Sequence, residues 1–115
     1  MRQTEFKRAV AALHSPYDPE TGQNWVAHYS TSDRGDVEAS LQLPGNRWYN
    51  IHITPRPELR ETHVQVDYIY KPGQLDGMIE EINPDYAFHS RGEAFDYAEM
   101  WLSKAKGIRN GNIIA

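Results

Sequence analysis

The stretch WYNIHIT, residues 48–54, decides the fold because its apolar and polar side chains alternate with the period of a β-strand. A strand alternates in this way when one face of its sheet packs on a core and the other face is open. We therefore expect a sheet with one exposed face. The apolar side holds Tyr49, Ile51 and Ile53, and the other side holds Trp48, Asn50, His52 and Thr54.

Three more runs alternate in the same way and extend this sheet. They are residues 25–31, 36–43 and 63–71. The links between the runs are mostly short and contain glycine, proline, asparagine or aspartate, which favours turns between antiparallel neighbours. The sequence therefore predicts a four-stranded antiparallel meander.

Helical spacing occurs at three places, residues 4–13, 73–83 and 90–107. Each segment has one apolar stripe, as a helix packed on a core does. Together with the strands they predict a two-layer α+β sandwich ordered α-β-β-β-β-α-α, with one N-terminal and two C-terminal helices on the apolar face of the sheet. The other face is then left open. We expect residues 1–107 to form one domain and 108–115 a C-terminal tail.

Capping residues mark the ends of the first and last of these helices. Thr4 is the expected N-cap of the first helix. Ser90 and Glu93 have the spacing of a capping box, in which each side chain binds the other's free backbone N–H. Gly107 is the residue type that ends helices, so we expect the last helix to end there.

Composition narrows the class of protein. The 115 residues have a net charge of −4, which disfavours nonspecific attraction to nucleic acid. There is no cysteine, so disulfides and thiolate metal sites are excluded. No run approaches 18 apolar residues, and the charged start does not resemble a signal peptide. We expect a cytoplasmic protein with no membrane partner, no cofactor and no metal.

Side alternation also predicts which residues face each other, because a slip of one residue would put apolar side chains in water. Directly opposite side chains lie about 5 Å apart. With the second hairpin centred on Gly45, two polar rows cross the open side of the sheet. The predicted pairs are His28–Ser40, Ser40–Asn50, Glu38–His52, Gln42–Trp48, Asn50–Asp67 and His52–Gln65.

We expect a small non-catalytic binding protein, an inhibitor or adaptor that recognises another protein. Tryptophan and arginine are the residue types that anchor protein interfaces. The proline-stiffened loop at 54–62 presents arginines at little ordering cost, and the acid-rich stretch 76–99 offers a second, helical surface. The expected contact residues are Trp48, His52, Arg56 and Arg60, with Asp76, Glu80 and Glu81 on the acidic surface.

Three other interpretations stay open at this stage. The partner can be a second copy of this chain, which makes a homodimer. Single-stranded nucleic acid can stack on Trp48, with arginines at the strand ends as a basic rim. A hydrolase-like enzyme can use His52 as a general base oriented by Glu38.

Overall fold

The computed structural model describes residues 2–15, 17, 19, 22, 24–45, 47–70 and 79–111. Two α-helices, five strands and one short 3-10 helix make up the described chain. In chain order they are α1 (Gln3–Ala12), β1 (Ala27–Thr31), β2 (Val37–Leu43), β3 (Arg47–Arg56), η1 (Pro57–Leu59), β4 (Glu61–Tyr70), β5 (Ile79–Phe88) and α2 (Arg91–Arg109).

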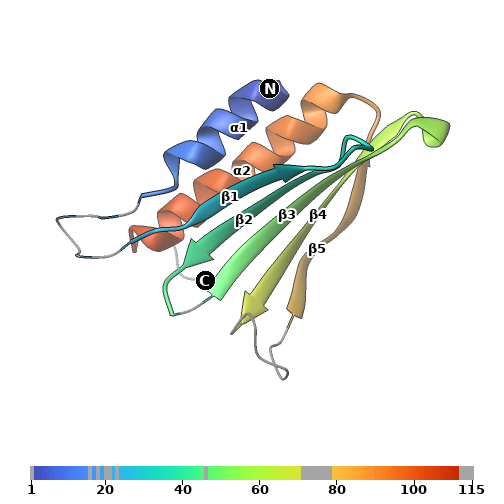
Figure 1. The fold of residues 1–115 in the computed structure, drawn as a ribbon. Coiled ribbons are helices and arrows are strands. Elements are labelled where there is room, and N and C mark those ends of the chain that lie inside the picture. Colours follow the sequence, from blue (N-terminus) through green and yellow to red (C-terminus); the bar gives the residue numbers. More distant parts are fainter. Residues whose placement is uncertain are drawn as a thin grey trace.

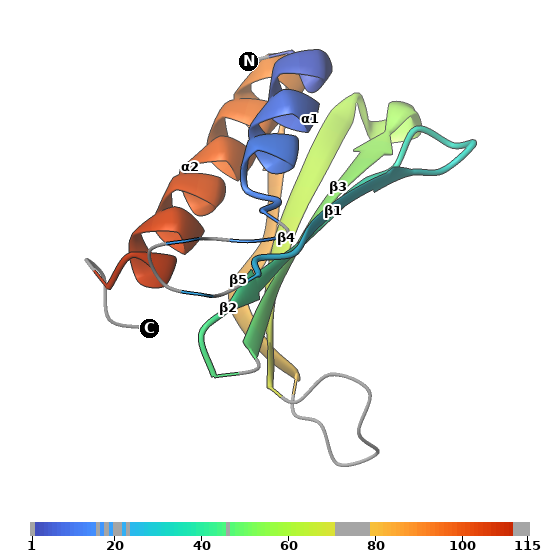
Figure 2. The ribbon, with the colours of Figure 1, turned by 60° about the vertical axis from the view of Figure 1, so that its left-hand side comes forward.

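The strands form one antiparallel sheet in the order β1-β2-β3-β4-β5. Both helices lie on the same face of this sheet, and the two views agree that no described helix covers the other face (Figures 1 and 2). The α+β class and the open face are therefore confirmed. None of the described helices is long and apolar enough to cross a membrane.

The prediction of a helix at residues 73–83 is wrong for its second half. Residues 79–88 form β5, which pairs with β4 along the edge opposite β3. The prediction failed because β4 has a second edge whose backbone groups need partners, and this long-range pairing overrides local helical spacing. Pro84 is tolerated because β5 is an edge strand. Residues 71–78 lie outside the described chain.

The core fills the space between the helices and the inner face of the sheet. Small buried residues on α2, including Ala94, Ala98 and Ala105, let the helix pack against the strands. Between the two helices, the ring centroids of Phe6 and Phe95 lie 5.5 Å apart. Burial alternates strictly along β2, where every second side chain is buried. This inner face comprises Val37, Ala39, Leu41, Leu43, Tyr49, Ile51, Ile53, Val64, Val66 and Tyr68.

The strand registers agree with the prediction at all six pairs on the open face. Those pairs are His28–Ser40, Ser40–Asn50, Glu38–His52, Gln42–Trp48, Asn50–Asp67 and His52–Gln65. The β2–β3 hairpin is centred on Gly45, whose φ of 77° is a backbone conformation that glycine adopts without strain. Alternation and turn chemistry thus specify the same register.

The predicted loop at 54–62 is shorter in the structure. Strands β3 and β4 pair as far as Arg56 and Glu61, so only residues 57–60 connect them. Pro57 begins the 3-10 turn, and Arg60 ends it in the left-handed region at φ 53°. Pro55 and Arg56 are therefore part of strand β3, and Glu61 and Thr62 are part of strand β4.

The ends of the helices differ in part from the prediction. Ser90 caps α2 by accepting a hydrogen bond from the Glu93 backbone N–H at 3.4 Å, as expected. Gly107 does not end α2, which continues to Arg109 with Ile108 buried in the core. Thr4 does not cap α1, which begins at Gln3 and has no side-chain cap.

Arg109 explains why α2 extends beyond Gly107. Its guanidinium donates hydrogen bonds to the backbone carbonyls of Leu13, Val26 and Gln42, and it stacks on the Trp25 ring. Leu13 follows α1, Val26 precedes β1 and Gln42 lies in β2. One side chain therefore joins three segments to the end of α2. Burial lowers the pKa of Arg109 to about 10, which still leaves it charged at neutral pH.

Candidate functional site

The open face of the sheet is the face opposite the helices, and it is built by the polar residues that alternate with the core residues. Because strand side chains point alternately to the two faces, the core positions place their neighbours on the outside. The open face comprises His28 and Ser30 of β1, Glu38, Ser40 and Gln42 of β2, Trp48, Asn50, His52, Thr54 and Arg56 of β3, and Glu61, His63, Gln65 and Asp67 of β4.

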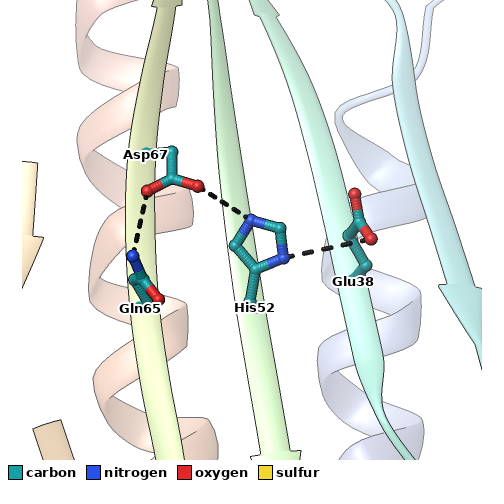
Figure 3. A network of polar contacts seen from close by, with 4 residues as sticks. All are labelled: Glu38, His52, Gln65 and Asp67. Atoms are coloured by element: carbon teal, nitrogen blue, oxygen red, sulfur yellow. Dashed lines mark hydrogen bonds and ion pairs between the residues drawn. The ribbon is translucent and has the colours of Figure 1, made fainter. Parts of the chain in front are cut away.

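His52 is the centre of a polar network that crosses three strands of the open face (Figure 3). Its Nε2 atom lies 3.1 Å from Asp67 Oδ2, and its Nδ1 atom lies 3.9 Å from Glu38 Oε2. The Gln65 amide donates a hydrogen bond of 3.3 Å to the other oxygen of Asp67. The predicted row of Glu38, His52 and Gln65 is therefore present, but the closest partner of His52 is Asp67.

Asp67 reaches His52 along the diagonal of the sheet. In the register His52 is opposite Gln65, and Asp67 is two residues further along β4. Diagonal neighbours lie about 7–8 Å apart at the backbone, within reach of an aspartate and an imidazole. The sequence identified both residues as members of the open face, but it could not indicate which carboxylate His52 contacts.

The contact with Asp67 assigns the proton on the neutral His52 ring. A carboxylate can only accept, so Nε2 must donate to Asp67, and Nδ1 of the neutral ring is then an acceptor. At 3.9 Å the Glu38 oxygen is too far for a direct hydrogen bond. In the neutral ring, His52 Nδ1 and Glu38 Oε2 are therefore two acceptors that face each other. We call the space between them the His52–Glu38 gap.

A shallow depression of about 250 Å³ lies beside this gap, between β1, β2 and β3. We call it the β1–β3 depression. Its lining includes two carboxylates, His52 and several hydroxyl groups, and it contains no lysine or arginine. The lining residues are Ser30, Thr31, Ser32, Asp36, Val37, Glu38, His52 and Thr54.

A second histidine lies between two carboxylates near the η1 end of the sheet. His63 Nδ1 is 2.7 Å from Asp85 Oδ2, and its Nε2 is 3.2 Å from Glu61 Oε1. The hydrogen bond that Asp85 accepts is the main reason that the pKa of His63 is raised. Burial opposes this effect, and Glu61 adds to it. Sequence reasoning missed this group because recognising Asp85 as a neighbour of His63 requires the pairing of β5 with β4.

The other predicted contact residues are spread along strand β3 and its hairpin. Trp48 lies on the open face but is only half-buried, and its indole N–H is shielded from solvent without an acceptor among the described residues. Arg56 and Arg60 are exposed at the end of the β3–β4 hairpin. The structure thus places Trp48, His52 and Arg56 on one strand, with Arg60 beyond its end.

The prediction that Glu80 and Glu81 lie on a helix is wrong. Glu80 and Glu81 belong to strand β5, where their backbones pair with Tyr68 and Asp67, and Asp76 lies outside the described residues. The helix that does follow, α2, has three acidic and four basic residues, so its charges are mixed.

Comparison of the chain with protein-family models, curated proteins and solved structures finds no match. The chemistry of the site therefore has to be argued from its geometry. Within the described chain, no three histidine, aspartate or glutamate side chains converge closely enough to hold a metal ion. What the open face offers is a set of hydrogen-bond acceptors held in place by their mutual contacts.

Proposed function

We propose that this is a non-catalytic binding protein, an inhibitor or adaptor, that recognises another protein through the open face of its sheet. One observation carries this proposal: His52, Asp67 and Gln65 form a hydrogen-bonded chain, with Glu38 3.9 Å from the other side of the His52 ring, on a face that no described element covers. Side chains that already hold one another lose less conformational entropy when a partner binds. The β3–β4 hairpin, with Arg56 and Arg60, extends the same surface.

The nucleic-acid interpretation has less support from the geometry. The carboxylates of Glu38, Glu61 and Asp67 lie on the open face and repel phosphate groups, whose charge dominates nucleic-acid affinity. Trp48 is half-buried, so much of its ring is not free to stack on a base. Binding of a protein does not require attraction of phosphate groups or a fully exposed Trp48 ring.

The enzyme interpretation also has less support. Both ring nitrogens of His52 face carboxylates, and the neighbouring β1–β3 depression contains no cationic side chain that could stabilise a developing negative charge. Glu38, the predicted orienting residue, lies 3.9 Å away, whereas Asp67 is in hydrogen-bond contact. The network fits recognition better than turnover.

Site-specific photo-crosslinking in cells of the source organism tests the proposal. A photoreactive amino acid is placed at Ser40 or Asn50 on the open face, and at Ser103 or Lys106 on the exposed side of α2 as matched controls. We expect Ser40 and Asn50 to give the same protein adduct and the two α2 positions to give none. Equal adducts from both faces, or none from the open face, would contradict the proposal.

A further inference from the structure

The β1–β3 depression has the size and polarity of a pocket for one side chain. Its volume of about 250 Å³ is below the roughly 300–1,000 Å³ that is common for small-molecule sites. Its lining is almost wholly polar, with Ser30, Ser32 and Thr54 supplying hydroxyl groups around Asp36 and Glu38. A long polar side chain of a partner fits such a site better than an apolar one.

Charge indicates the sign of that side chain. Asp36 immediately precedes β2 and Glu38 is the second residue of β2, and both carboxylates line the depression. Neither carboxylate makes a hydrogen bond within the described chain, and like charges so placed repel each other. The adjoining depression of about 410 Å³ differs, because Arg34 and Arg56 line it together with Asp36 and Glu58. Of the two depressions, the β1–β3 depression is therefore the one whose carboxylates have no lysine or arginine beside them in the lining.

The His52–Glu38 gap indicates which cation is favoured. His52 Nδ1 lies 3.9 Å from Glu38 Oε2, and when the ring is neutral with its proton on Nε2 both atoms are acceptors. A group with several N–H donors can then bind both at once. A guanidinium has five donors in a planar fork, whereas an ammonium is a point charge. Asp67 holds the His52 ring from its other side at 3.1 Å, which keeps Nδ1 directed at the gap.

We infer that the β1–β3 depression binds an arginine side chain of the partner protein, with Glu38 and the Nδ1 atom of His52 as its main acceptors. This inference rests on the proposed function, because it names the group that the open face recognises. Glu38 and His52 contact the ligand, and Asp67 is a positioning residue that acts through His52.

Titration of the intact protein with short peptides, followed by amide chemical shifts, tests the inference. The probes are acetyl-Gly-Gly-Arg-Gly-Gly-amide and the same peptide with lysine or with citrulline, which is neutral and nearly isosteric with arginine. We expect the arginine peptide to shift amides in residues 30–32 and 37–38 and to bind more tightly than the lysine peptide. The citrulline peptide should bind at least about tenfold more weakly, since it lacks the charge.

Two variants and one control locate the binding. Glu38→Gln and Asp36→Asn should each weaken the arginine peptide, with Glu38→Gln about tenfold. Glu5→Gln removes the same charge from an exposed residue of α1 and should leave binding of the arginine peptide unchanged. Equal binding of citrulline, an equal loss in Glu5→Gln, or no shifts on the open face would each overturn the inference.

The peptide titration and the photo-crosslinking fail independently. If Ser40 and Asn50 give a partner adduct but the arginine peptide does not bind, the proposed function stands and the arginine pocket is wrong. If the peptide binds as described but the open face gives no adduct, the pocket stands and protein recognition by this face is wrong.

Discussion

Asp67 Oδ2 accepts a hydrogen bond from His52 Nε2 at 3.1 Å, although the two residues are diagonal rather than opposite in the register. Glu38, which is directly opposite His52, is 3.9 Å away on the other side of the ring. The right-handed twist of a sheet brings one diagonal of each strand pair closer than the other. The two carboxylates that flank His52 therefore have unequal roles, and mutation should separate them.

Asp67→Asn should lower the free energy of unfolding by about 1 kcal/mol, because it replaces a charged acceptor of two side-chain hydrogen bonds. Glu38→Gln should change it by less than about 0.5 kcal/mol, since Glu38 is exposed and beyond hydrogen-bond range. Urea denaturation at pH 7 measures both variants. A larger loss in Glu38→Gln than in Asp67→Asn would show that the assigned contact is wrong.

Asp85→Asn should make stability less dependent on pH. Asp85 raises the pKa of His63 above its ordinary value of 6.5, so the charged form of His63 stabilises the folded state. This contribution to the free energy of unfolding is fully present below pH 6.5, and it is lost as the pH rises through the folded-state pKa of His63.

The measurement is denaturation of the wild type and Asp85→Asn between pH 5 and pH 9, with Asp33→Asn in an exposed turn as the control. The difference between wild type and Asp85→Asn should be largest at the acidic end and should shrink toward pH 9. A difference that stays constant across this range would contradict the contact between Asp85 and His63.

Arg109→Met should lower the free energy of unfolding by about 2–4 kcal/mol. It removes the donor that Arg109 supplies to the carbonyls of Leu13, Val26 and Gln42. The Val26 carbonyl still accepts from the Gln42 backbone N–H, but polar groups left without a donor away from water are costly. Lys106→Met is the matched control, because Lys106 is exposed in the same turn of α2. Thermal and urea denaturation measure the effect, and a loss no greater than that of Lys106→Met would exclude the structural role of Arg109.

Gly92→Ala should raise the free energy of unfolding by up to about 0.5–1 kcal/mol. Gly92 lies in the first turn of α2, and a Cβ there meets only Ser90 Oγ at 3.6 Å, an ordinary contact. Gly45→Ala should instead be destabilising, because a side chain is strained at its φ of 77°. Opposite shifts of the denaturation midpoint are expected, and shifts of the same sign would contradict one of the two backbone assignments.

Local pattern determined a large part of this protein. The alternation of residues 36–43 and 48–54, together with the turn at Gly45, was sufficient for the register, because one-residue slips expose the core. Membership of the open face followed from the same period, so the sequence could place Glu38, His52 and Asp67 on one surface. The capped start of α2 at Ser90 was readable for a similar reason, since a cap depends on residues close in sequence.

Tertiary structure alone decided what depends on distant partners. Residues 79–83 have a spacing that also suits a helix, and they became part of β5 because the free edge of β4 pairs with them. That pairing brings Asp85 to His63, and only the folded structure shows that Asp67, rather than Glu38, is in hydrogen-bond contact with His52. Arg109 extends α2 because three carbonyls from separate segments converge on it. Side-chain period is a local property that the sequence states directly, whereas edge pairing, twist and buried polar satisfaction arise only when the whole chain is folded.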